Sequence, residues 1–341
     1  MSGAQNQHYV PKFILRQFLC DADNERVSVY DKHTEKRFIT SIKNVMAERR
    51  FNDFDFDEDY IVSFEGIACG IEDMILPVYR KVLQTRTLPS DPEGIASLAF
   101  FIAFQFVRTR AHREKMALFE SALKEKLETI GGRLEDIKGY KPSDENDLKR
   151  RHLLSLKEDV HSFALIISLK EFRLFSSPPG RSFYLGDHPV SLHNSNDFGP
   201  YGNIGLAVPG IEIYMPLSAD LMLGAWCPSI MNGLENSLRE SKNERDKAMV
   251  SALVSGRFTI QQATSLAEEL RPHYEKAERD LSLLKALEAI PTDEENMDFA
   301  NSLQTMYASR YVISKENDFN LAIRHNSEFP KFRRGMQPRF D

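Results

Sequence analysis

The sequence has few cysteines, a single tryptophan and no excess of positive charge. Its 341 residues contain 3 cysteines, and Cys20, Cys69 and Cys227 lie far apart without CxxC spacing. This number and spacing predict free thiols in a reducing compartment and argue against a zinc site made of cysteines. Lys and Arg total 44 against 50 Asp and Glu, which gives a net charge of −6. A uniformly basic nucleic-acid-binding surface is therefore excluded, whereas a local basic cleft is not.

Long hydrophobic segments are also missing. The most apolar stretch, 95–107 (IASLAFFIAFQFV), has 13 residues and is interrupted by Ser97 and Gln105, whereas a membrane span needs about 20 apolar residues. A helix that is apolar on all sides is typical of the centre of a fold, so we expect a buried helix and no membrane contact. The N-terminal sequence MSGAQNQHYV lacks the basic start and apolar run of a signal peptide, which predicts a cytoplasmic protein.

Several common catalytic motifs do not occur in the chain. There is no GxxxxGK[ST] phosphate loop, no strand-borne GxGxxG, no HExxH and no GxSxG. These absences count against the common nucleotide-binding, zinc-protease and hydrolase classes. A catalytic site assembled from scattered residues stays open.

The pattern that is present predicts an α+β fold with a mostly helical core and a small antiparallel sheet. Helical periodicity or capping signals mark 11–19, 60–83, 90–127, 145–170, 232–289 and 294–309. Short β-type segments lie at 26–30, 37–40, 182–185, 190–192, 211–215, 221–225 and 311–314. We expect one domain over 1–341, with a charged helical insertion at about 232–290 and a basic C-terminal tail at 330–341.

The first candidate constellation is the segment Gln7 to Pro11, which precedes a predicted helix. An imidazole at a helix N-terminus suits anion binding or general acid–base catalysis, which makes His8 a candidate catalytic residue with Tyr9 beside it. The alternative is that Tyr9 and Val10 pack as a hydrophobic staple while His8 hydrogen-bonds to backbone.

The second constellation lies at the end of the apolar helix. Within one long helix, Phe101, Gln105, Arg108 and His112 would share one face, which passes from apolar to polar. Polar groups there either line a pocket or satisfy one another in the core. Arg108 needs a carboxylate or a phosphate, so it either binds ligand or pairs with Asp187, Glu65 or Glu72. Arg110 is a candidate for binding substrate, and the alternative is that its side chain is simply exposed to solvent.

The third constellation is the turn Asp187-His188-Pro189 after a predicted strand. Asp187 could orient a histidine, pair with Arg108 or ligate a metal, or it could only bond its own backbone. Weaker candidates are grouped on and near other helices: Glu65, Glu72, Asp73, Asn301 and Arg310. The acidic segment 52–59 (NDFDFDED) is expected to be a solvated loop, with a metal site as the alternative.

Five ordered segments together resemble the family of domain of unknown function (DUF) 4238. They are HYVPKFILRQF, QFVRTR, FYLGDHPV, IEIYMPLSADLML and NSLQTMYASRYVIS, and they cover the chain from His8 to about Ser314. The family is marked by a His-Tyr-Val-Pro motif. The resemblance implies a site that gathers His8, Gln105, Arg108, Asp187 and Asn301, and it implies no particular activity.

These observations favour two hypotheses of different classes. The first is a nuclease-like, phosphodiester-acting enzyme, such as a toxin-like or phage-defence effector, that acts on RNA or DNA. Its catalytic residues would be His8, Gln105, Arg108 and Asp187. The substrate would be bound by Tyr9, Arg110, His112, His188 and Asn301. A divalent metal ion such as Mg²⁺ is a possible cofactor. The second is a non-catalytic module that binds a small anionic ligand or a protein partner.

Overall fold

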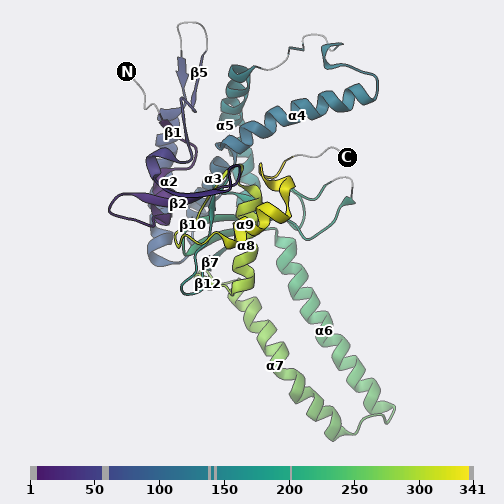
Figure 1. Ribbon diagram of the computed structural model, residues 1–341. Helices are drawn as coiled ribbons and strands as arrows, with labels where there is room; N and C mark the ends of the chain where they lie inside the picture. Colours follow the sequence, from purple (N-terminus) through teal and green to yellow (C-terminus); the bar gives the residue numbers. More distant parts are fainter. Residues whose placement is uncertain (1–5, 56–60, 137–139, 142–143, 200–201, 338–341) are drawn as a thin grey trace.

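The computed structural model describes residues 6–55, 61–136, 140–141, 144–199 and 202–337. Over these residues the chain has the α+β architecture that the sequence predicts, with helices packed around two central sheets (Figure 1). The three cysteines are free.

The helical layer is centred on α3 (Pro92–Val107). Asp91 caps this helix by accepting a hydrogen bond from the Gly94 N–H, and Pro92 occupies its first turn, where no N–H is needed. Its side chains are buried on nearly every face because α5 (Glu145–Ser168) and α2 (Glu65–Thr85) pack against it. None of the described helices is both long and apolar enough to cross a membrane.

The prediction of one continuous helix over 90–127 is wrong. Helix α3 ends with Arg108 as its C-cap, Thr109 is extended, and a separate helix, α4 (Arg110–Thr129), begins after it. The Thr109 side chain accepts a hydrogen bond from the His112 N–H, and the ring Nε2 of His152 lies 2.7 Å from the Val107 carbonyl oxygen. Both contacts satisfy backbone groups that a helix end leaves free. His112 therefore does not continue the stripe of Phe101, Gln105 and Arg108.

The strands form two main sheets and two small hairpins. The larger sheet is mixed, in the order β12-β7-β11-β10-β9, with β12 parallel to β7. Its strands are β7 (Glu171–Ser176), β9 (Ser191–His193), β10 (Glu212–Ser218), β11 (Leu221–Trp226) and β12 (Ile290–Pro291). The second sheet, in the order β3-β2-β13-β8, is antiparallel and consists of β2 (Arg26–Asp31), β3 (Lys36–Ser41), β8 (Leu185–Gly186) and β13 (Tyr311–Ile313). The single small antiparallel sheet of the prediction is thus replaced by several sheets, one of them mixed.

Short elements at the N-terminal end join the sheets to the helices. The hairpins pair β1 (Asn6–His8) with β4 (Ala47–Arg49) and β5 (Asp53–Asp55) with β6 (Ile61–Ser63). The helical turns there are α1 (Lys12–Leu15), η1 (Arg16–Phe18) and η2 (Ile42–Asn44), and η3 (Leu134–Asp136) follows α4. Of the acidic segment 52–59, residues 56–59 lie outside the described residues, and Asp53 and Asp55 contact Arg50.

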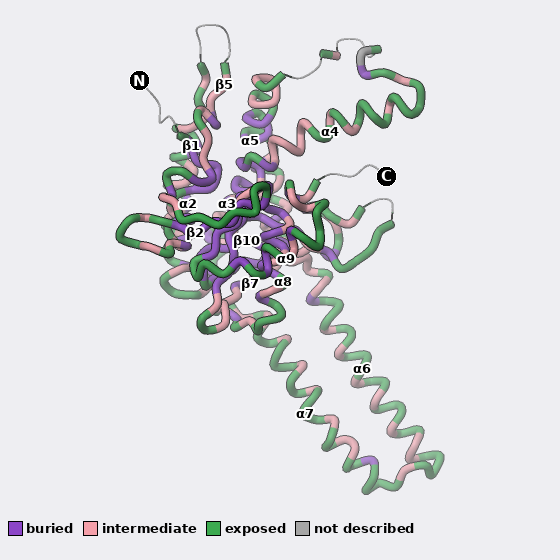
Figure 2. The backbone as a smooth tube through the Cα atoms, in the orientation of Figure 1, coloured by how far each residue is buried: buried purple, intermediate pink, exposed green. Residues whose placement is uncertain are grey.

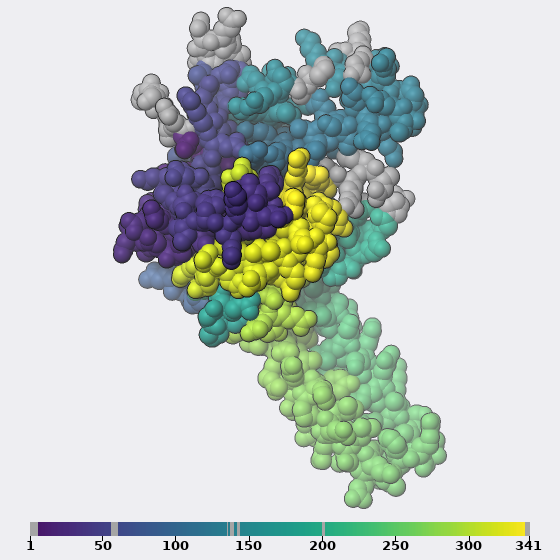
Figure 3. Space-filling model, in the orientation of Figure 1, coloured from purple at the N-terminus to yellow at the C-terminus, as the bar shows by residue number. Residues whose placement is uncertain are grey.

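The C-terminal elements return the chain to its N-terminal strands. Helix α8 (Glu294–Tyr307) is followed by β13, α9 (Asn320–Glu328) and η5 (Pro330–Phe332). β13 lies between β2 and β8, so residues from both ends of the chain share one sheet. Figure 3 shows the same neighbourhood as a contact between the yellow C-terminal and dark purple N-terminal surfaces.

The charged region at 232–290 forms an arm of two long helices, α6 (Pro228–Val254) and α7 (Ile260–Leu284). The arm projects from the rest of the protein (Figures 1 and 3). Met231 and Ala263 are its only buried helical residues, and most of the arm is green or pink in Figure 2. The arm therefore leaves most of its surface outside the core.

Candidate functional site

Two side chains at the end of α3 hold the backbone of the N-terminal segment. The amide Nε2 of Gln105 donates to the Tyr9 carbonyl at 2.9 Å, and Nη2 of Arg108 donates to the His8 carbonyl at 2.7 Å. Nη1 of Arg108 lies 2.7 Å from a carboxylate oxygen of Glu72 on α2. Of the alternatives open from the sequence, the structure shows the buried pair of Arg108 with Glu72. Gln105 and Arg108 thus contact the segment that carries His8, through the His8 and Tyr9 carbonyls.

The His8 imidazole is buried and contacts the turn η2. Its Nε2 lies 2.8 Å from the Ile42 carbonyl oxygen, and burial lowers the pKa of His8, against that hydrogen bond. The ring of Tyr9 packs on Phe51, and burial together with the negative charge of Asp187 raises the pKa of Tyr9 well above its ordinary value. A histidine in this setting stays neutral at neutral pH.

Asp187 is buried at the junction of α8 and β13. Its oxygens accept hydrogen bonds from the Ser309 N–H and hydroxyl and from the N–H groups of Arg310 and Tyr311, at 2.6–3.1 Å. Burial raises the pKa of Asp187, and these hydrogen bonds oppose the shift. The prediction that Asp187 orients His8 or pairs with Arg108 is wrong, because its carboxylate is occupied by residues 309–311. Asp187 instead fixes the backbone that carries Arg310.

His188 and Asn301 hold the same region from the inside. Nδ1 of His188 lies 2.6 Å from the Thr109 hydroxyl, and its ring stacks on Tyr307 at an interplanar angle of 17°. Nε2 of His188 is buried without a hydrogen-bond partner among the described residues, and burial lowers the pKa of His188 well below its ordinary value. The Asn301 amide accepts from the Tyr184 N–H and donates to the Ser182 carbonyl.

His112 lies on the α4 side of this region, packed against the rings of Phe106 and His152. Burial lowers the pKa of His112 to about 4 and that of His152 to about 3. Neither of the two imidazoles carries a positive charge at neutral pH. His112 is therefore not a cationic ligand for a phosphate at that pH.

An open cleft of about 420 Å³ lies beside these buried groups, and we call it the C-terminal cleft. Its walls come from the start of α4, the end of α8 with residues 309–310, and the C-terminal residues 334–337. Its charged lining residues are Arg110, Glu114, Lys115, Arg310 and Arg334, four cations and one carboxylate. A concave surface with an excess of one charge concentrates ligands of the opposite charge.

The cations of the C-terminal cleft differ in their partners. Arg110 pairs with Glu48 and Glu114 at 2.8 and 2.7 Å. Arg310 donates to Asp31 through Nε and Nη2, at 3.1 and 2.8 Å. Lys115 and Arg334 have no acidic partner in the described part of the chain. Two cations of the cleft are therefore free to bind an anion, and Arg110 was the one cleft cation included in the predicted site.

Lys115 and Arg334 are site residues that the sequence did not predict, and Arg310 was predicted only as a weaker candidate. Lys115 lies five residues after Arg110 in a charged helical segment, where a lysine normally indicates a solvated face. Arg334 belongs to the basic tail, and no local pattern places the tail beside α4. The signal that could have found them is the local excess of basic residues in both segments.

The described residues contain no preformed metal-binding site. They contain no group of three or more His, Cys, Asp or Glu side chains that could hold an ion. Cation binding by Asp187 would have to replace its hydrogen bonds to residues 309–311.

The chain was compared with known families, curated proteins and solved structures. The family described as a protein of unknown function, DUF4238, matches residues 6–318. Neither the curated proteins nor the solved structures gave a match.

Proposed function

The chain belongs to the DUF4238 family, whose function is unknown, and we propose from the geometry of the C-terminal cleft that the protein binds a phosphate-bearing ligand there. The observation that carries the proposal is that Lys115 and Arg334 line one cleft and have no acidic partner among the described residues. An arginine matches phosphate oxygens with its planar fork, and a lysine adds a compact charge. The volume of about 420 Å³ is within the usual range of small-molecule sites.

The buried groups support this location of the site over the His8 and Arg108 cluster. Arg108 already has a carboxylate and a carbonyl as partners, and a bound phosphate would have to compete with both. Asp187 presents Arg310 to the cleft by holding residues 309–311. The buried cluster of His8 and Arg108 thus stabilises the fold, while the C-terminal cleft contains positive charges, on Lys115 and Arg334, that no carboxylate of the described residues neutralises.

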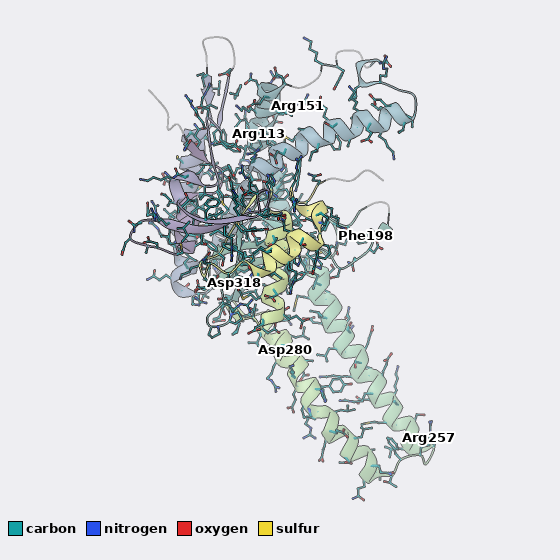
Figure 4. All side chains as sticks on the ribbon, in the orientation of Figure 1. Arg113, Arg151, Phe198, Arg257, Asp280 and Asp318 are labelled. Carbon is teal, nitrogen blue, oxygen red and sulfur yellow. The ribbon has the colours of Figure 1, made fainter. Side chains whose placement is uncertain are left out.

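The test is a calorimetric titration of the full-length protein with inorganic phosphate, a nucleoside 5′-monophosphate and a short single-stranded RNA, which measures the affinity for each ligand. Arg334→Gln and Lys115→Gln should each weaken binding by about tenfold, the effect of losing about 1.4 kcal/mol of interaction. Arg257→Gln is the matched control, because Arg257 lies at the far end of the arm (Figure 4) and its nearest hydrogen bond goes to Ser255. Equal affinity in all variants would refute the site.

Phosphodiester cleavage by a nuclease-like enzyme stays a prediction, as does a toxin-like or phage-defence role. Incubation with total RNA, plasmid and single-stranded DNA, in Mg²⁺, Mn²⁺ or EDTA, tests it directly. Cleavage that is lost in His8→Ala while the fold survives would support the sequence-based assignment. Phosphate binding without any cleavage would favour the non-catalytic alternative.

A further inference from the structure

Lys115 has surroundings unlike those of an ordinary surface lysine. It lies on the second turn of α4, lines the C-terminal cleft and places its Nζ 5.4 Å from the centre of the Tyr307 ring. The neighbouring carboxylate, Glu114, bonds Arg110 instead. Among the described residues, no carboxylate and no hydrogen-bond acceptor engages the Lys115 ammonium.

This environment disfavours the charged form of the side chain. Burial lowers the pKa of Lys115 to about 8. About a tenth of the molecules then carry a free amine at pH 7, compared with less than a thousandth for a lysine of ordinary pKa. The free amine is the nucleophilic form of lysine.

Lys115 shares the C-terminal cleft with other cations. Arg110, Arg310 and Arg334 line the same cleft, and Arg334, which has no acidic partner among the described residues, would hold the anionic group of a ligand on the same surface as Lys115. Lys32 makes the contrast clear: burial also lowers its pKa to about 8, but its ammonium donates to the carbonyls of Thr305, Ala308 and Phe332. The Lys32 ammonium is occupied by three carbonyls, whereas Lys115 lines the cleft and donates to no acceptor among the described residues.

We propose that Lys115 captures an aldehyde or ketone that carries a phosphate or carboxylate group, by forming an imine within the C-terminal cleft. This inference rests on the proposed anion binding, since Arg334 would hold the anionic group while the Lys115 amine reacts. It adds a covalent step and a substrate class to that site.

The step needs no oxidant or reductant. The nitrogen lone pair forms a bond to the carbonyl carbon as the π electrons move to oxygen, and a proton passes from nitrogen to that oxygen to give a carbinolamine. The carbinolamine loses its hydroxyl group and the remaining nitrogen proton as water. The products are one imine and one water molecule.

The probe for this reaction is pyridoxal 5′-phosphate, an aldehyde with a phosphate, followed by borohydride reduction and peptide mapping of the full-length protein. We expect Lys115 to be modified at an at least tenfold lower probe concentration than exposed lysines such as Lys81 and Lys36. Pyridoxal, which lacks the phosphate, should modify Lys115 at least tenfold less, and inorganic phosphate should compete. The rate should rise with a midpoint near pH 8.

One conservative variant makes the result decisive. Lys115→Arg should lose the selective modification while circular dichroism shows the native fold. Modification spread evenly over surface lysines, or kept in Lys115→Arg, would overturn the inference, as would equal reaction with pyridoxal. If calorimetry detects phosphate binding and Lys115 is still unmodified, the imine fails alone. If phosphate does not bind at all, the proposed function fails first.

Discussion

Replacing Arg108 with methionine tests whether the residues at the end of α3 stabilise the fold. The arginine side chain is 3% exposed and has two charged hydrogen bonds of 2.7 Å, to Glu72 and to the His8 carbonyl. Methionine replaces the aliphatic stem but lacks the guanidinium, whose central carbon lies 4.7 Å from the centre of the Phe104 ring, and it removes the donor to both partners. Breaking a buried pair costs about 3–5 kcal/mol. Because the Glu72 side chain is 24% exposed and can be rehydrated, we expect a loss of about 3 kcal/mol.

This loss in the free energy of unfolding is measured by urea denaturation. The signal is the fluorescence of Trp226, the single tryptophan, which lies on β11 in the larger sheet. Arg110→Met is the matched control, because Arg110 is 46% exposed and its ion pairs with Glu48 and Glu114 lie at the surface. Such pairs contribute less than about 1 kcal/mol. Arg108→Met within 1 kcal/mol of wild type would refute the reasoning.

A double-mutant cycle with Glu72→Gln isolates the ion pair itself. If Arg108 and Glu72 stabilise one another, the double variant should lose less stability than the sum of the two single variants, by about 0.5–3 kcal/mol. Strict additivity would mean that the 2.7 Å contact contributes nothing.

Three other predictions follow from buried groups. Lys115→Met should raise the free energy of unfolding at pH 7 by about 1–2 kcal/mol, because burial lowers the pKa of the lysine to about 8 and the charged form destabilises the folded state. Wild-type stability should accordingly gain from a rise in pH between 8 and 10.5, and this gain should shrink in the variant. Asp187→Asn should cost about 2–4 kcal/mol in urea unfolding, since an amide NH₂ would face N–H donors of residues 309–311. His112 and His152 have folded pKa values of about 4 and 3, so only the unfolded chain binds their protons below pH 6.5. Stability should therefore fall with pH from 6.5 to 4, by up to about 1.4 kcal/mol per unit for each histidine, and His112→Gln should reduce that slope.

Local patterns predicted the elements whose cause is local. The alternation at 26–30 and 37–40 with a turn between them gave the β2–β3 hairpin, and Asp91-Pro92 gave the start of α3. The break at Thr109 was missed because the apolar periodicity continues into a helical segment, although Thr is a good N-cap residue. Strand β7 was missed because Arg173 interrupts its apolar residues. In the fold, Arg173 is buried and bonds Glu171 and the Phe172 carbonyl.

The candidate site depends on contacts between distant segments, which local patterns do not encode. The sequence offered three carboxylates for Arg108, and the packing of α2 on α3 selects Glu72. The C-terminal cleft needs residues 110–118, 307–310 and 334–337 together. The Lys32 ammonium helps to bring the last two together, because it bonds the Thr305, Ala308 and Phe332 carbonyls. No pattern around Lys32 predicts those partners.

Unused hydrogen-bonding capacity, more than burial or a shifted pKa, separates the candidate functional groups from the structural ones. Lys32 and Lys115 both have a pKa lowered to about 8, yet the first donates to three carbonyls and the second, within the described residues, to none. Arg108 and Arg334 differ in the same way, since Arg108 donates to Glu72 and to the His8 carbonyl, whereas Arg334 lines the C-terminal cleft and pairs with no carboxylate of the described residues. A cation whose donors are already satisfied contributes to the fold, and a bound anion must compete for it. A cation left unsatisfied beside a cleft destabilises the empty protein and gains a partner when an anion binds. This difference is the physical reason to look for the function of the protein at Lys115 and Arg334.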